Sequence, residues 1–131
     1  MLQRPLPVAG ASVRLARMTT RVACRAWRVP SEQETAALVV SELVTIVVRH
    51  AAPEQLAGAR SPAASQLLNL RVLMTPRRLR LEVHDPSGAV PADVGASGED
   101  GAALAVVTGA CGRWGIECHL PGAQLWAELA V

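Results

Sequence analysis

Residues 34–51 lie within the longest stretch without glycine or proline, residues 31–52, and have their apolar residues at helical spacing. These residues are Ala36, Val39, Val40, Leu43, Ile46, Val47 and Ala51. Steps of three and four place them in one wide stripe, which predicts an amphipathic helix. Glu42 lies one turn before Ile46, so its carboxylate leaves the helix on nearly the same side as the stripe. That carboxylate belongs either at the solvated edge of the stripe or at a functional site.

A second helical pattern covers residues 12–28, with Ser12 as the expected N-cap. We predict that Leu15, Met18, Val22 and Ala26 form its buried face. Arginines at three-and-four spacing mark the other side: Arg14, Arg17, Arg21, Arg25 and Arg28. Such a basic stripe is either a solvated face or a docking surface for an acidic protein partner, through Arg14, Arg17 and Arg21.

Helix-capping and turn residues, together with the alternation of apolar and polar residues, predict the remaining elements. Ser31 and Glu34 have the spacing of a capping box before the long helix. Residues 67–74 and 79–84 read as a β-hairpin, because Leu79, Leu81 and Val83 alternate with polar residues. Residues 114–120 and 124–129 read as two further strands, and residues 2–8, with two prolines, suit only an edge strand.

Two long loops and a short helix complete the prediction. Residues 52–65 and 86–101 are rich in glycine, proline and small residues, which is typical of functional or disordered loops. Small apolar residues at 101–110 predict a closely packed helix that Gly112 closes in the left-handed conformation. The expected order is β-α-α-β-β-α-β-β, and the fold class is a two-layer α/β sandwich. We expect a mixed sheet of about five strands with three helices on one face.

Composition narrows the class of protein. The 131 residues fit one domain, residues 1–131, and half of them are apolar. The 13 basic residues are all arginine, and the net charge of +2 is too small to indicate direct nucleic-acid binding. The three cysteines, Cys24, Cys111 and Cys118, lack zinc-site spacing and fit reduced, buried thiols in a cytoplasmic protein. The sequence has neither the pattern of a signal peptide nor that of a membrane span.

Four segments together resemble successive sequence motifs of the GHKL ATPase superfamily. They are residues 41–51 (SELVTIVVRHA), 83–88 (VHDPSG), 101–107 (GAALAVV) and 113–116 (RWGI). The most similar branch comprises small actinobacterial ATP-binding proteins similar to anti-sigma-factor serine kinases. The resemblance covers nearly the whole chain, and the motifs occur in the family's order. It implies a Bergerat-type ATP-binding fold, and it makes a homodimer a reasonable expectation.

The resemblance implies roles for individual residues. Glu42 takes the place of the catalytic base, and Asp85 that of the aspartate that binds the adenine amino group. Ser87 and Gly88 correspond to the first glycine motif. Gly101, Ala103 and Leu104 correspond to the second, which cradles phosphates. Asp85 before Pro86 is also ordinary turn chemistry, and His50 suits a packed or capping histidine near a helix end.

The chain departs from the family at the phosphate-handling positions. Ile46 occupies the position of the Mg²⁺-ligating asparagine and offers no oxygen, so Mg²⁺ is not expected. Ala102 lacks the guanidinium of the usual arginine, and Ala103 adds a Cβ where the backbone approaches phosphate. We therefore expect a pseudo-enzyme with impaired Mg-ATP binding, in which Glu42 is idle, and at most weak binding of ATP or ADP.

Three hypotheses stay open. The first is a partner-binding regulatory module that holds a sigma factor, an anti-anti-sigma protein or another transcription regulator. The second is an active ATP-dependent serine kinase and anti-sigma factor that phosphorylates an anti-anti-sigma protein. The third is a nucleotide sensor without turnover.

Overall fold

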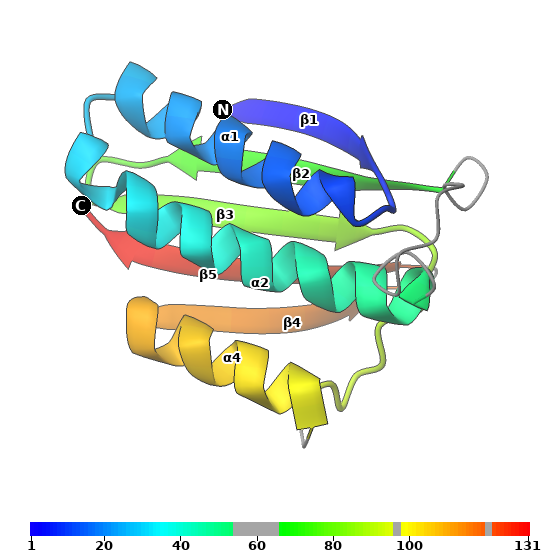
Figure 1. Cartoon of the computed structure of the whole chain (residues 1–131). Helices are drawn as coiled ribbons and strands as arrows, with labels where there is room; N and C mark the ends of the chain where they lie inside the picture. The colour runs from blue at the N-terminus through cyan, green and yellow to red at the C-terminus, as the bar shows by residue number, and fades with distance from the viewer. Residues whose placement is uncertain (54–65, 96–97, 120–121) are drawn as a thin grey trace.

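A computed structural model describes residues 1–53, 66–95, 98–119 and 122–131. Within them five strands form one sheet, with helices on one face only (Figure 1). The strands are β1 (Leu2–Pro7), β2 (Leu67–Met74), β3 (Arg78–Asp85), β4 (Arg113–His119) and β5 (Gly122–Ala130). The helices are α1 (Ala11–Ala26), α2 (Gln33–Ala51), α4 (Gly98–Ala110) and the 3₁₀ turn η1 (Pro30–Glu32). The predicted element order and the two layers are confirmed; the predicted loop at 52–65 lies almost wholly outside the described residues.

The prediction of a mixed sheet is wrong, because every neighbouring pair of strands is antiparallel. The strand order is β1-β2-β3-β5-β4. The crossover through α4 makes β3 and β4 run in the same direction, but β5 lies between them (Figure 1). If β4 lay directly beside β3, the two strands would form a parallel pair. Because β5 returns from β4 and lies between them, the sheet instead has the two antiparallel pairs β3–β5 and β5–β4.

The core lies between the sheet and the helices, and it is aliphatic. Alternate residues of the central strands point into it, as the hairpin pattern predicts: Leu79, Leu81 and Val83 have no exposed surface. The helix α2 contributes ten buried residues, because α1 and α4 flank it on the sheet (Figure 1). The predicted long helix is confirmed. Its buried residues include apolar side chains outside the predicted stripe.

Helix α1 buries a different face from the one predicted. Met18 and Val22 are 52% and 58% exposed, whereas the fully or largely buried residues are small. They are Ser12, Ala16, Thr19, Thr20, Ala23 and Cys24. Small side chains let two helices approach closely, so packing against the neighbouring elements selects this face over the one with the larger residues.

Both predicted helix caps and the predicted Gly112 turn are wrong. The residue before α1 is Gly10, and the Ser12 hydroxyl donates to the Pro7 carbonyl oxygen instead of capping the helix. Before α2 the N-cap position is Glu32, without a side-chain cap, because the η1 turn leads directly into the helix. Positive φ occurs at Gly88, Gly95 and Gly98, so Gly112 closes α4 without the left-handed conformation.

The open face of the sheet is covered by charged pairs. Glu82 is only 6% exposed, although its side chain points away from the core. It accepts a hydrogen bond from Arg80 at 2.6 Å and pairs with Arg71 at 3.2 Å. Arg80 also lies 4.3 Å above the ring of Trp126. One arginine of the same strand and one of the neighbouring strand β2 thus pair with this buried carboxylate.

Glu34 pairs with α1 instead of capping α2. Arg21 Nε and Nη2 donate to its two carboxylate oxygens at 3.0 Å each. The hydrogen bond from Arg21, aided by the charges of Arg21, Arg25 and Arg17, outweighs the opposing effect of desolvation, so the pKa of Glu34 lies below its ordinary value of 4.5. A lowered pKa in the folded state means that this pair stabilises the fold above pH 4.5, and that the contribution disappears as pH falls through the folded pKa.

We expect a carbon-detected NMR titration to find the Glu34 midpoint below 4.5. In Arg21→Gln the midpoint should return toward the ordinary value. Arg14→Gln is the matched control, since Arg14 lies on the same helix without contacting Glu34, and it should leave the midpoint unchanged. Equal midpoints in the wild type and in Arg21→Gln would contradict this pairing.

The cysteines are free thiols in different environments. Cys24 is buried, Cys111 is half-buried and Cys118 is exposed. Burial raises the pKa of the Cys24 thiol, with the charge of Glu32 adding to the shift. The prediction that all three are buried is wrong for Cys118. No helix among the residues described is long and apolar enough to cross a membrane.

Candidate functional site

Three elements that carry predicted site residues end or begin on the same side of the molecule. The C-terminal half of α2, the end of β3 and the start of α4 lie together at the right in Figure 1. The sequence places Glu42, Asp85 and Gly101 on these three elements. The fold therefore brings the candidate nucleotide-site segments to one end of the sheet. The predicted partner-binding arginines lie on a fourth element, α1.

Asp85 is fully buried at the end of β3, and its carboxylate closes the turn that follows. Its Oδ1 accepts hydrogen bonds from the Ser87 backbone N–H at 2.9 Å and from the Ser87 hydroxyl at 2.6 Å. Its Oδ2 accepts from the Ala89 N–H at 3.2 Å. Gly88, at φ 72°, supplies the left-handed residue that this turn needs. Both carboxylate oxygens are thus engaged within the turn.

Ile46 is a core residue. Its exposed fraction is 0%, as it is for Val47 and Val48 beside it, whereas Glu42 one turn earlier is half-buried. Among the described residues no hydrogen bond or ion pair holds the Glu42 carboxylate. The same part of the chain contains no cluster of three or more His, Cys, Asp or Glu side chains that could hold a metal ion. An aliphatic side chain at position 46 offers a hard cation no ligand.

Two basic residues and two carboxylates join the end of α2 to the start of α4; we call them the α2–α4 clasp: Arg49, His50, Glu99 and Asp100. Arg49 Nη1 donates to Asp100 Oδ1, and His50 Nε2 lies 2.5 Å from Asp100 Oδ2. Arg49 Nε also pairs with Glu99 Oε2 at 2.9 Å. Asp100 is the best shielded member, with 13% of its side chain exposed, compared with 80% for Glu99.

The clasp also suits the dipoles of both helices. The Arg49 cation in the last turn of α2 and the carboxylates in the first turn of α4 each lie at the helix end of opposite partial charge. The sequence predicts Glu99 and Asp100 in the loop 86–101, whereas the structure begins α4 at Gly98 and places both residues in its first turn. The sequence did not indicate that His50 and Asp100 meet, because Asp100 lies 50 positions after His50 along the chain.

The predicted second glycine motif forms the first turns of α4. Ala103 and Leu104 are each 5% exposed, so their side chains belong to the core. Gly95, at φ 90°, lies against Leu104, and a Cβ at Gly95 would lie 2.3 Å from Leu104 Cδ1. A Cβ at Gly101 would lie 3.2 Å from the Gly95 carbonyl oxygen. The segment before α4 therefore packs directly onto the turn at which a phosphate cradle was predicted.

The predicted partner-binding arginines differ in availability. Arg14 is exposed, Arg17 is half-buried with an Nε that has no partner among the described residues, and Arg21 is held by Glu34. Arg25 is exposed and donates to Gln33 Oε1 at 3.0 Å. Of the three predicted partner-binding arginines, Arg14 is thus the exposed one without a partner among the described residues.

Compared with known proteins, the chain matches no family model and no curated protein.

Proposed function

We propose that this chain is a regulatory, partner-binding protein of the anti-sigma-factor type on a GHKL-like domain, with impaired binding of Mg-ATP and little or no kinase activity. The observation that carries the proposal is the complete burial of Ile46 at the position where the resembled family has its Mg²⁺ ligand. Phosphoryl transfer relies on positioning and on charge neutralisation by the metal, so a site without that ligand lacks its main source of catalysis.

Two further observations support the loss of nucleotide handling. The carboxylate of Asp85, the candidate adenine acceptor, already accepts hydrogen bonds on both oxygens from Ser87 and Ala89. Asp100 places a carboxylate between Arg49 and His50, so the Arg49 guanidinium near the start of α4 is neutralised by the chain itself. An incoming triphosphate would have to displace this carboxylate and would meet its negative charge.

Under this proposal the protein acts by holding a protein partner. By resemblance, the partner is a sigma factor, an anti-anti-sigma protein or another transcription regulator. The exposed arginines of α1, together with the absence of acidic residues in its first turn, support a basic docking surface.

Calorimetric titration with ATP, with ADP and with either nucleotide plus Mg²⁺ tests the proposal. We expect no Mg²⁺-dependent heat below millimolar nucleotide, and no phosphoryl transfer to a serine-containing anti-anti-sigma protein. Glu42→Gln should behave like the wild type, because an idle base has no reaction to lose. Metal-dependent micromolar binding would overturn the proposal in favour of an active kinase, and metal-independent micromolar binding would favour the nucleotide sensor.

A further inference from the structure

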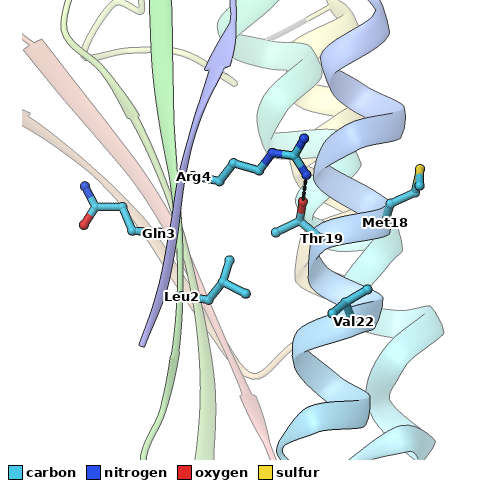
Figure 2. A pocket seen from close by; sticks show the side chains of 6 residues that line it. All are labelled: Leu2, Gln3, Arg4, Met18, Thr19 and Val22. Atoms are coloured by element: carbon cyan, nitrogen blue, oxygen red, sulfur yellow. Dashed lines mark hydrogen bonds between the residues drawn. The ribbon is translucent and has the colours of Figure 1, made fainter.

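A hollow of about 360 Å³ lies between the edge strand β1 and helix α1 (Figure 2). Its lining residues are Leu2, Gln3, Arg4, Met18, Thr19 and Val22, and we call it the β1–α1 hollow. Leu2 and Arg4 point from β1 toward α1, whereas Gln3 points to the opposite side of the strand (Figure 2). Met18 and Val22, which are more than half exposed, form its apolar border on α1. The hollow thus has an apolar lining that faces solvent.

Cationic groups surround this apolar lining. Arg4 Nη1 donates to Thr19 Oγ1 at 3.0 Å, which holds the guanidinium across the hollow while its other N–H groups remain available. On α1, Arg14, Met18, Val22 and Arg25 follow one another at helical spacing and are all exposed. The two arginines therefore lie at either end of the apolar pair.

The charged side chains of β1 and α1 are all arginines, and Glu34 of α2 lies against α1 in its pair with Arg21. Residues 1–31 contain six of the 13 arginines and none of the 11 acidic residues. A partner surface that complements the hollow and its arginines carries apolar side chains in the middle and carboxylates around them. Aliphatic Met18 and Val22 favour a protein over a single-stranded nucleic acid, whose bases stack on aromatic side chains.

The edge of β1 indicates which kind of segment docks. Pro5 and Pro7 have no backbone N–H, and the Val8 N–H donates toward β2, to Gln66 O at 2.9 Å. The backbone N–H groups of a strand point alternately to its two sides, so positions 3, 5 and 7 of β1 are directed at the open edge of the sheet. Of these three positions, only Gln3 has a backbone N–H to donate there. An added strand would lack most of its ladder hydrogen bonds, so a partner must dock through side chains.

We propose that the β1–α1 hollow binds an acidic amphipathic helix of a protein partner. Apolar side chains of that helix pack on Leu2, Met18 and Val22, and its flanking carboxylates pair with Arg4, Arg14 and Arg25. This inference rests on the proposed function of the chain as a partner-binding module, and it names the surface and the chemistry of the partner.

The test uses a fluorescein-labelled 18-residue helical peptide with leucines at three-and-four spacing and glutamates on both flanks. A matched peptide carries lysine in place of each glutamate. We expect the acidic peptide to bind, measured by fluorescence anisotropy, and its NMR shift changes to fall on β1 and α1. Met18→Asp and Val22→Asp should each weaken binding on the order of tenfold, as expected for a central apolar contact. Leu38→Asp, at a position that is 45% exposed on α2, is the control and should leave binding unchanged.

Several results would overturn the inference. They are the absence of binding at millimolar peptide, equal binding of the lysine peptide, and equal binding by Met18→Asp. A wild-type dimer in light scattering that Met18→Asp converts to a monomer would assign the hollow to a second copy of the chain. Duplex DNA binding that Arg4→Gln abolishes, without peptide binding, would assign it to nucleic acid. None of these measurements involves ATP or ADP. A negative peptide result, which overturns this inference, is therefore distinguishable from tight Mg-ATP binding, which overturns the proposed function.

Discussion

Replacing Ile46 by asparagine is expected to lower the free energy of unfolding by about 3 to 4 kcal/mol, without creating Mg²⁺-dependent ATP binding. The substitution removes aliphatic volume from a side chain with 0% exposure and buries an amide in the hydrophobic core. Lost packing accounts for about 1 to 3 kcal/mol, and an unsatisfied polar group adds a penalty of similar size. Urea unfolding followed by circular dichroism measures the loss.

Two control variants separate packing from polarity at position 46. Ile46→Val keeps an apolar side chain and should cost only about 1 kcal/mol. Thr45→Asn places the same amide on the adjacent half-buried position, where solvent satisfies it, and should cost less than Ile46→Asn. A variant Ile46→Asn that is as stable as Ile46→Val and binds Mg-ATP would contradict this prediction. Position 46 would then face a functional pocket, and the side chain at this one position would account for the proposed loss of Mg-ATP binding.

Replacing Asp100 by alanine is expected to lower the free energy of unfolding by about 2 kcal/mol. The Asp100 side chain is 13% exposed and contacts both Arg49 and His50, so its removal leaves the guanidinium and the imidazole without their shared partner. Breaking a fully buried ion pair costs about 3 to 5 kcal/mol, and exposed pairs contribute about 0 to 1 kcal/mol. The clasp lies between these limits because Arg49 and His50 are each about one quarter exposed.

Glu99→Ala provides the matched comparison for the clasp. Glu99 also pairs with Arg49, but it is 80% exposed, so its loss should change stability by less than about 0.5 kcal/mol. Urea unfolding of both variants, together with Arg49→Met and the double variant Arg49→Met/Asp100→Ala, gives the coupling energy. Additive effects of Arg49→Met and Asp100→Ala would mean that these two groups do not interact in solution.

Much of the fold follows from local patterns. The alternation around Leu79, Leu81 and Val83 predicts the buried face of β3, and the three-and-four spacing in residues 34–51 predicts α2, because in both cases large aliphatic residues define the face. The strand directions do not follow from such patterns. They depend on β5 lying between β3 and β4, and this position follows from the pairing of β5 with β3, which is distant in the sequence.

The candidate site is predicted less completely than the fold. The sequence places Glu42, Asp85 and Gly101 on elements that the fold gathers at one end of the sheet (Figure 1). It leaves open whether Asp85 serves a ligand or its own turn, because the same residues, Asp-Pro-Ser-Gly, suit both. The hydrogen bonds from Ser87 and Ala89 are visible only in three dimensions. Membership in the GHKL superfamily remains a resemblance in four motifs.

The sequence by itself determined the elements, their order, the aliphatic core and the chemical character of position 46, because these depend on residue type and on spacing within one helix or strand. Only the tertiary structure decided which face of α1 is buried. Close approach to its neighbours favours Ala16, Thr20 and Ala23, and this leaves Met18 and Val22 exposed beside Arg4. Tertiary packing also brought Asp100 onto Arg49 and His50, since electrostatic pairing across about 50 residues has no local signature.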